Sequence, residues 1–405
     1  MAEDICIRPS STGAENGDPL TWFGGMVNHC CDFAERAKAE GRPIVGIMCE
    51  FTPREIILAV GGVPVCLCGG SAATIPPAEQ VLPVNLCPLI KSTFGYHLTG
   101  KNPFLNWADL VVAETTCDGK KKMFELLSAS RPMYVLELPQ KAEDTDSFEH
   151  WVLEVRKLQE HLASRFGVEI TDAMLVQAIQ LMNRERGLRR QLADLMVAES
   201  PPLTGRHLLE FKSLISGIEA DLQQYERAVQ KYGQANGAPS DTNHASRIRQ
   251  HAWPVRVLLT GVPLAHGAER VLELIEGCGA VVVCMENCTG LKPILEDVDL
   301  AGEPDPIRAI ARKYYHLPCS VMTPNPGRFE SLRALAAKFR PHCVIELVWQ
   351  ACLTYDVESY QVRQLVEEDL HLPYLKITTD YSPSDSARIT ARVEALLEMV
   401  RARAA

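Results

Sequence analysis

The sequence predicts an α/β protein with two similar lobes, each built on a mostly parallel sheet, and a helical middle section between them. Short apolar runs alternate with helical patterns before residue 145, and the same rhythm returns after residue 254. The section between these parts contains helical patterns but no strand pattern. At 405 residues the chain is also too long for one ordinary hydrophobic core. We therefore expect two α/β lobes that face each other across a cleft.

The first part of the chain divides into a lead-in and a lobe. Residues 1–40 form a lead-in that ends in a helix, and residues 41–145 form the first α/β lobe. A capping box at Thr52-Pro53-Arg54-Glu55, with proline at the first helical position, predicts a helix start. Buried strands are expected at residues 44–49, 63–68, 110–114 and 133–138.

The second half begins with the helical middle section, which we place at residues 146–233. Asp146 and Glu149 resemble another capping box, and further helices are expected near 171–198 and 203–232. Residues 234–247 are polar and rich in small residues, which is typical of a linker, and we place this linker at residues 234–253. The second α/β lobe then covers residues 254–405. Its expected strands lie near 255–260, 280–284, 344–348 and 374–377, and its closing helix at 384–403.

Composition excludes several classes of function. The net charge of −10 argues against a general nucleic-acid binder. No apolar run reaches the roughly 20 residues that span a bilayer, so we expect no membrane segment. The first residues, Met1 to Cys6, have neither the basic start nor the apolar core of a signal peptide. Fourteen cysteines without an export signal indicate a reducing compartment, so a cytoplasmic protein is expected.

Four cysteines form two matched pairs, Cys87 with Cys117 and Cys319 with Cys352. The spacings are 117 − 87 = 30 and 352 − 319 = 33 residues. In each pair the first cysteine opens a loop, and the second follows an apolar strand-like run and precedes a helix. Ligands of an open parallel sheet bind beyond the carboxyl ends of its strands. The cysteines at or just past such ends are Cys49, Cys68, Cys117, Cys288 and Cys352. Thiols that converge there from two lobes suit an iron–sulfur cluster.

Other interpretations of the cysteines remain. Structural zinc sites usually use paired Cys-x2–4-Cys knuckles, and only Cys284 with Cys288 could form one. Ferredoxin-type cysteine runs are also absent, so a cluster would be assembled from distant loops. A buried cysteine is often only a small apolar side chain. We expect that inert role for Cys6, Cys30, Cys31, Cys278 and Cys343.

Two further motifs bear on chemistry. The run from Lys120 to Lys122 could neutralise a phosphate or a reduced cluster, or it could be a solvated helix face. The sequence has no Gly-x4-Gly-Lys-Ser/Thr loop, so the chain is not expected to hydrolyse ATP itself.

Several segments together resemble the 2-hydroxyacyl-CoA dehydratase family, and more closely its double-cubane cluster protein branch. The likeness runs from about residue 40 to the C-terminus. The segments that carry it are Gly46 to Glu55, Asn85 to Lys91, Glu114 to Met123, Glu286 to Gly290, Leu317 to Ser320, Trp349 to Cys352 and Thr379 to Ser382.

The resemblance implies a cluster in the cleft between the lobes. In the dehydratases three cysteines of a subunit hold a [4Fe–4S] cubane with one iron open to substrate, and the matching positions here are Cys87, Cys117 and Cys352. The double-cubane branch holds an [8Fe–9S] cluster, two cubanes bridged by one sulfide, on six cysteines. Cys49, Cys288 and Cys319 are the candidates for the second set, with Cys68 in reserve.

The resemblance also implies a function. The favoured interpretation is a low-potential iron–sulfur reductase of small substrates that receives electrons from a separate ATP-hydrolysing activator. The alternative is an (R)-2-hydroxyacyl-CoA dehydratase subunit, a lyase with a single [4Fe–4S] cluster. A cluster carrier without catalytic activity is a third possibility. A homodimer is expected for the favoured interpretation.

Overall fold

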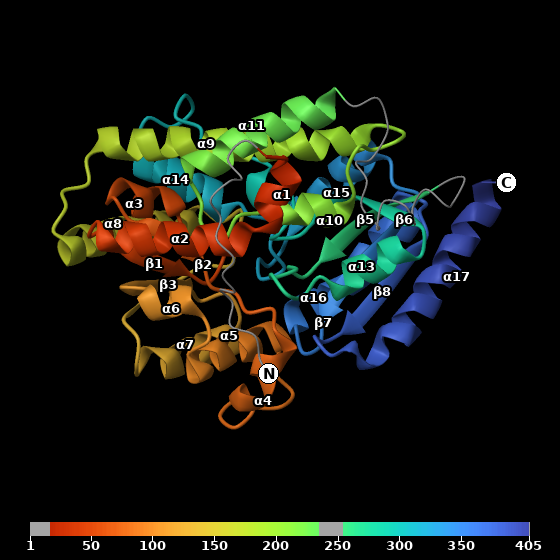
Figure 1. The fold of residues 1–405 in the computed structure, drawn as a ribbon, viewed down its shortest axis with the longest axis horizontal. Coiled ribbons are helices and arrows are strands. Elements are labelled where there is room, and N and C mark those ends of the chain that lie inside the picture. Colours follow the sequence, from red (N-terminus) through yellow and green to blue (C-terminus); the bar gives the residue numbers. More distant parts are fainter. Residues whose placement is uncertain (1–16, 235–253, 405) are drawn as a thin grey trace.

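Two four-stranded parallel sheets form the centres of two lobes in the computed structural model, which describes residues 17–234 and 254–404. The lobes lie side by side in Figure 1, the first in red to orange and the second in teal to blue, except that the teal helix α14 (Pro306–Tyr315) lies with the first lobe, against α8 (Thr145–Phe166). The first sheet contains β1 (Ile44–Ile47), β2 (Val63–Cys66), β3 (Leu110–Glu114) and β4 (Met133–Leu136). The second contains β5 (Val255–Gly261), β6 (Ala280–Glu286), β7 (Cys343–Trp349) and β8 (Tyr374–Thr379). The predicted fold class and all eight expected strands are confirmed.

The two sheets have the same strand order. It is β2-β1-β3-β4 in the first and β6-β5-β7-β8 in the second, and every pairing within the sheets is parallel. Every residue of the central strands β1, β3, β5 and β7 is buried, which explains their continuous apolar sequences. Parallel strands bring their carboxyl ends to one edge, so each lobe presents its strand ends as a group.

Two predicted helix starts lie within two residues of the observed ones, but the helices are capped differently. The helix α3 (Arg54–Ala59) has Pro53 at its N-cap, while the Thr52 hydroxyl donates to the Glu114 carboxylate at the end of β3. The helix α8 (Thr145–Phe166) is capped by Asp144, whose Oδ2 accepts from the Ser147 amide at 2.8 Å. The predicted capping boxes are therefore wrong, in the first case because a neighbouring strand takes the hydroxyl.

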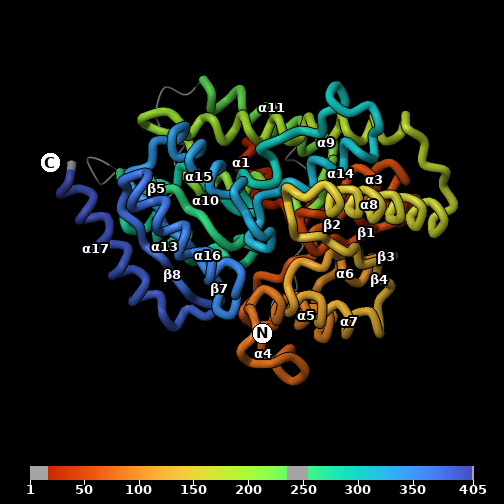
Figure 2. The backbone as a smooth tube through the Cα atoms, turned by 180° about the vertical axis from the view of Figure 1, so that it is seen from behind, coloured from red at the N-terminus to blue at the C-terminus, as the bar shows by residue number. Residues whose placement is uncertain are grey.

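The helical middle section runs over both lobes. The long helices α9 (Asp172–Asp194) and α11 (Glu219–Gly233) cross the top of the molecule in Figure 1, and Figure 2 shows the same arrangement from behind. The predicted helix at 203–232 is wrong as a single element, because it consists of α10 (Gly205–Glu210) and α11. Between them Ile215 pairs with Val65 and the Cys66 amide donates to the Leu214 carbonyl at 2.9 Å, so this segment covers the edge of β2.

The lead-in forms two helices, α1 (Pro19–Gly24) and α2 (Met26–Ala39), which pack against the middle section and the first sheet. Of the predicted linker, only Gln234 lies within the described residues. The remaining helices that surround the sheets are α4 (Ile75–Ala78), α5 (Pro88–Thr99), α6 (Pro103–Trp107), α7 (Asp118–Ser128), α13 (Arg270–Gly277), α14 (Pro306–Tyr315), α15 (Pro326–Phe339), α16 (Leu353–Gln364) and α17 (Ser386–Ala404). Within the described ranges, none of the helices combines the length and apolarity that a bilayer crossing requires.

Candidate thiol-lined site between the lobes

A cavity of about 750 Å³ lies where the two lobes and the lead-in meet. Its volume is within the range of cofactor and small-ligand sites. Both lobes contribute thiols to its wall, and so do loops far apart in the sequence. The cysteines that line it are Cys49, Cys66, Cys68, Cys87, Cys117, Cys288, Cys319 and Cys352. The cavity is therefore lined by all six predicted ligands. The reserve candidate Cys68 and Cys66, which was not predicted, line it as well.

Strand ends place most of these thiols. Cys49 and Cys68 lie two residues beyond β1 and β2, and Cys288 two residues beyond β6. Cys117 and Cys352 lie three residues beyond β3 and β7. The expectation that thiols gather outside the carboxyl ends of the strands is confirmed for both lobes.

Three of the cysteines are helix N-caps, and we call them the N-cap thiols: Cys87 before α5, Cys117 before α7 and Cys352 before α16. Each of these helices is 11 or 12 residues long, so each presents free amides and the positive end of its dipole near the thiol. Such a position stabilises a thiolate or an anionic group bound to it.

The N-cap thiols interact with one another. The Cys352 thiol hydrogen-bonds to Cys87, and this bond, together with the Ile90 and Leu89 amides, lowers the pKa of Cys87 to about 7 despite burial. The pKa of Cys352 is raised by the same hydrogen bond and by burial, with Cys87 and Cys117 as charged neighbours. The three thiols therefore form one electrostatically connected group.

Cys49, Cys288 and Cys319 form a second group, which we call the loop thiols because none of them caps a helix. Burial raises the pKa of Cys49, and its thiol neighbours are Cys288 and Cys319. Burial likewise raises the pKa of Cys288 to about 12, again with Cys319 as a neighbour. These electrostatic neighbours match the second set implied by the family resemblance, whose role as cluster ligands stays a prediction.

The spacing of the thiols bears on which metal could bind. No three of the cavity thiols lie within 4.8 Å of one another. The ligand sulfurs of a single tetrahedral zinc would be roughly 3.8 Å apart, given a Zn–S bond of about 2.3 Å. Cys284, the other member of the possible zinc knuckle, is buried inside β6 and does not line the cavity with Cys288. The wider spacing suits a polynuclear cluster.

Cys66 and Cys68 stand apart from both groups. Burial raises the pKa of Cys68, and its thiol neighbour is Cys66. The Cys68 thiol also points at the Met48 carbonyl, 3.5 Å away, while Arg54 Nη2 lies 3.8 Å from the Cys66 sulfur. Sequence reasoning missed Cys66, although alternate residues of a strand share one face and Cys68 marks that face.

The three lysines at residues 120–122 lie in two different environments, one beside the cavity thiols and one on a solvated helix face. Lys120 is turned into the cavity, where its Nζ donates to the Met48 carbonyl at 2.9 Å. Its pKa is raised by Cys49, Cys68, Cys117 and Glu114 against the opposing effect of burial, so it stays charged between the thiol groups. Lys121 and Lys122 are solvent-exposed and pair with Asp118 and Glu125 on their own helix.

Further cations lie beside the loop thiols. Lys212 Nζ donates to the Cys288 carbonyl at 2.9 Å and pairs with Glu50 at 2.7 Å. Lys292 is buried, pairs with Glu286 at 2.9 Å, and donates to the hydroxyl of Tyr355, which lines the cavity. Sequence reasoning missed Lys212, Lys292 and Tyr355. Tyr355, three residues after Cys352 and so on the same helix face, and Lys292, four residues after Cys288, had local signals.

The strand-end carboxylates of the lobes differ in their partners. Glu114, at the end of β3, is buried and accepts a hydrogen bond from Thr52, and burial raises its pKa to about 7. Glu286, at the end of β6, accepts from Thr260 at 2.5 Å and also pairs with Lys292 and Arg328. These two cations hold the pKa of Glu286 below its ordinary value against the effect of burial.

Gly69-Gly70, which is too short for a phosphate-binding motif, closes the contact between the lobes. A Cβ at Gly70 would lie 2.2 Å from the His266 carbonyl oxygen, so only glycine permits this approach. The Tyr381 hydroxyl donates to the Gly69 carbonyl at 3.1 Å from the second lobe. The lobes are therefore fixed beside the cavity.

Comparisons with known proteins agree with this arrangement. The family model described as 2-hydroxyglutaryl-CoA dehydratase, D-component, matches residues 49–400. YjiM of Escherichia coli (strain K12), a protein named as a dehydratase subunit, is 37% identical over 90% of this chain and 93% of its own. The beta subunit of lactoyl-CoA dehydratase from Anaerotignum propionicum is 23% identical over the same shares. One of the benzoyl-CoA reductase subunits of Thauera aromatica is 22% identical over 68% of each chain.

Proposed function

Because the chain belongs to the 2-hydroxyglutaryl-CoA dehydratase D-component family, whose members include dehydratase and reductase subunits, we propose that it is an iron–sulfur reductase of the double-cubane type. The observation that carries this proposal is the sorting of the cavity thiols. Six of them fall into two groups of three around one cavity, as two bridged cubanes would require.

The donor set fits such a group. The N-cap thiols, Cys87, Cys117 and Cys352, would hold one cubane, and the loop thiols, Cys49, Cys288 and Cys319, the other. When bound, an [8Fe–9S] cluster would supply electrons at low potential to a small substrate. The chain itself would set the electrostatics, since the helix N-termini face one group and Lys212 and Lys292 lie beside the other.

We propose a separate ATP-hydrolysing iron–sulfur activator as the electron donor, and a homodimer as the assembly. The absence of a phosphate-binding Walker loop from the sequence supports an external source of the ATP-driven step. Electron transfer to the anaerobic protein should then require both activator and ATP. Full reduction by an ordinary ferredoxin without ATP would contradict this part of the proposal.

The second candidate is an (R)-2-hydroxyacyl-CoA dehydratase subunit with a single [4Fe–4S] cluster on the N-cap thiols. Two observations favour it: several relatives are named dehydratase subunits, and the N-cap thiols are the group with a direct thiol–thiol hydrogen bond. In this case the loop thiols would remain free of iron.

Iron and acid-labile sulfide per chain distinguish the two candidates. We expect the anaerobically purified protein to be brown and oxygen-sensitive, with about eight irons per chain for the double cubane and about four for the dehydratase. A protein that contains only zinc after iron-replete anaerobic expression would rule out both.

A further inference from the structure

A second cluster of metal-binding side chains lies outside the cavity, between the lead-in and the middle section. It consists of His29 and Cys30 on α2 and Asp221 on α11. Their ligand atoms all lie within 4.8 Å of one another, and among the described residues this is the one such group of three His, Cys, Asp or Glu side chains. The cavity thiols, by contrast, are spread too widely for a single ion.

The three side chains are buried. Cys30 is fully enclosed, and the side chains of His29 and Asp221 are 11% and 3% exposed. The imidazole of His29 stacks on Trp22 with 4.6 Å between ring centroids and meets Phe23 edge-on. These rings exclude water, so a charged carboxylate here needs a partner inside the protein.

The hydrogen bonds of the cluster leave ligand positions open. The Trp22 indole donates to Asp221 Oδ1 at 2.8 Å, but Asp221 Oδ2 has no hydrogen-bond partner among the described residues. His29 Nε2 lies 3.1 Å from Asp221 Oδ1 without the geometry of a hydrogen bond. A buried charged oxygen without a partner costs more than about 1–3 kcal/mol. Two ligands of one tetrahedral zinc would be roughly 3.3 Å apart, close to this N···O distance.

We propose that His29, Cys30 and Asp221 form a structural zinc site. One imidazole, one thiolate and one carboxylate suit zinc, whereas magnesium and calcium prefer oxygen alone. The fourth position would be filled by the Ser213 hydroxyl, which lies 3.3 Å from the Cys30 sulfur. The Trp22 indole would orient the carboxylate, as outer partners of metal ligands commonly do.

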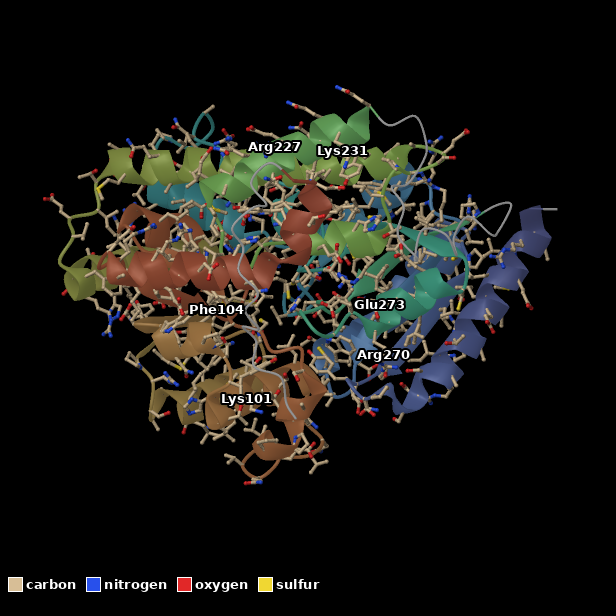
Figure 3. The ribbon with its side chains drawn as sticks, in the orientation of Figure 1. Lys101, Phe104, Arg227, Lys231, Arg270 and Glu273 are labelled. Atoms are coloured by element: carbon tan, nitrogen blue, oxygen red, sulfur yellow. The ribbon has the colours of Figure 1, made fainter. Side chains whose placement is uncertain are left out.

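The zinc site would stabilise the part of the cavity lining that α2 and the segment before α11 provide. Phe23, Met26 and Val27, next to the ligands of α2, line the cavity, and so does Leu214, next to Ser213. The Leu214 amide and Met26 sulfur are 3.4 Å apart. Hydrogen bonds also connect the start of α1 to α11, since Asp18 accepts from Lys231 and Tyr232. Figure 3 labels Lys231 on α11, above α1. Zinc would complete this attachment.

The test uses anaerobic protein with its iron in place, dialysed against zinc and then against buffer. We expect about one zinc per chain, and a zinc K-edge absorption spectrum with a single sulfur at about 2.3 Å and lighter ligands near 2.0–2.1 Å. Three or four sulfurs per zinc, or no retained zinc, would overturn the proposal.

Variants locate the metal. Asp221→Asn, which keeps an acceptor for Trp22, and Cys30→Ser should each lose the zinc and keep the iron, whereas the control Cys343→Ser, a buried cysteine in β7, should keep both. Mild chelation should lower the thermal unfolding midpoint of the wild type by several degrees and leave that of Asp221→Asn unchanged. Zinc that persists at full occupancy in Asp221→Asn and Cys30→Ser would refute the assignment, whatever their stability.

Discussion

The N-cap thiols and the loop thiols border the same cavity, but the protein compensates their negative charge by different means. Backbone amides at three helix starts compensate the first group, with Lys120 as a charged neighbour of Cys87 and Cys117. Buried lysines and the tyrosine hydroxyl serve the second. The pKa of Cys87 is lowered to about 7, mainly by its hydrogen bond with Cys352, whereas burial raises the pKa of Cys288 to about 12.

This difference has a physical meaning. A helix N-terminus supplies partial positive charge without burying an ionised side chain, so its contribution is fixed by the fold. A buried lysine must be desolvated and held by a carboxylate, so its contribution depends on a network that single substitutions can break. The positive charge near the N-cap thiols is therefore less sensitive to single substitutions. The charge near the loop thiols depends more on the identity of individual side chains.

Removal of single thiols should have the largest effect. Each Ser variant of an N-cap thiol, at Cys87, Cys117 or Cys352, should lose the half of the iron held by that group. Each Ser variant of a loop thiol, at Cys49, Cys288 or Cys319, should lose the other half. Three-point ligation tolerates little loss of a thiolate. Activator-dependent turnover should fall more than about 100-fold in all six. Iron per chain, measured anaerobically, is the readout.

The outcome for Cys49 is the most informative of the six. A Cys49→Ser protein with all its iron and activity would contradict the assignment of that residue. Cys68 would then be the next ligand to test, because it lines the same cavity.

Loss of a buried cation beside the loop thiols should come next in size. Lys292→Met leaves Glu286 with Arg328 as its remaining ion-pair partner among the described residues, in a fully buried site. We expect the free energy of unfolding to fall by about 3–5 kcal/mol, since a broken buried pair leaves an uncompensated charge. Urea unfolding measures this change.

The control for that variant is Lys122→Met, whose side chain is 74% exposed. It should change the free energy of unfolding by less than about 0.5 kcal/mol. Equal effects of the two substitutions would remove the contrast between buried and exposed cations.

Glu114 provides a pH test of the buried carboxylates. Among the described residues no ion pair holds it, whereas Lys292 and Arg328 pair with Glu286 in the other lobe. Its folded-state pKa is about 7, raised by burial from an ordinary value of 4.5. Between these values the folded state retains a proton that the unfolded chain has lost. The free energy of unfolding should therefore decrease as pH rises from about 4.5 to 7, by about 3 kcal/mol.

Glu114→Gln isolates this effect, because glutamine keeps an acceptor for Thr52 and does not titrate. The variant should be more stable than the wild type at pH 8, and the advantage should shrink towards pH 5. Thermal unfolding of both proteins at several pH values gives the difference. A constant difference across this range would show that Glu114 is not the titrating group.

The two halves of the site also differed in how far the sequence predicts them. Cys87, Cys117 and Cys352 stand directly before helices, so local patterns indicate their positions. Cys49 and Cys288 were expected at strand ends and Cys319 in a matched pair, but their grouping as a second ligand set came from the family resemblance. Lys212 reaches Cys288 only through tertiary packing, which no local pattern describes, whereas Lys292 is four residues after Cys288.

The fold shows the same limit. All eight strands were predicted, and the central strands β1, β3, β5 and β7 have the continuous apolar sequences of fully buried parallel strands. The helix at 203–232 was not, because the segment around Ile215 pairs with β2 instead of continuing the helix. Thr52 failed as a cap for a similar reason, since Glu114 binds its hydroxyl. In both cases a contact distant in sequence overrides the local preference.

The smallest effect is expected for a cysteine that belongs to neither group. Cys343 is fully buried in β7, and burial raises its pKa to about 12, so it is a neutral apolar side chain. Cys343→Ser should retain all iron and lose about 1–2 kcal/mol of unfolding free energy, because a hydroxyl replaces a less polar thiol in the core. Cys278→Ser, at a partly exposed position after α13, should retain the iron at a smaller cost in stability. Iron loss in either variant would mean that thiols outside the cavity also bind the cluster, and the division into two groups of three would fail.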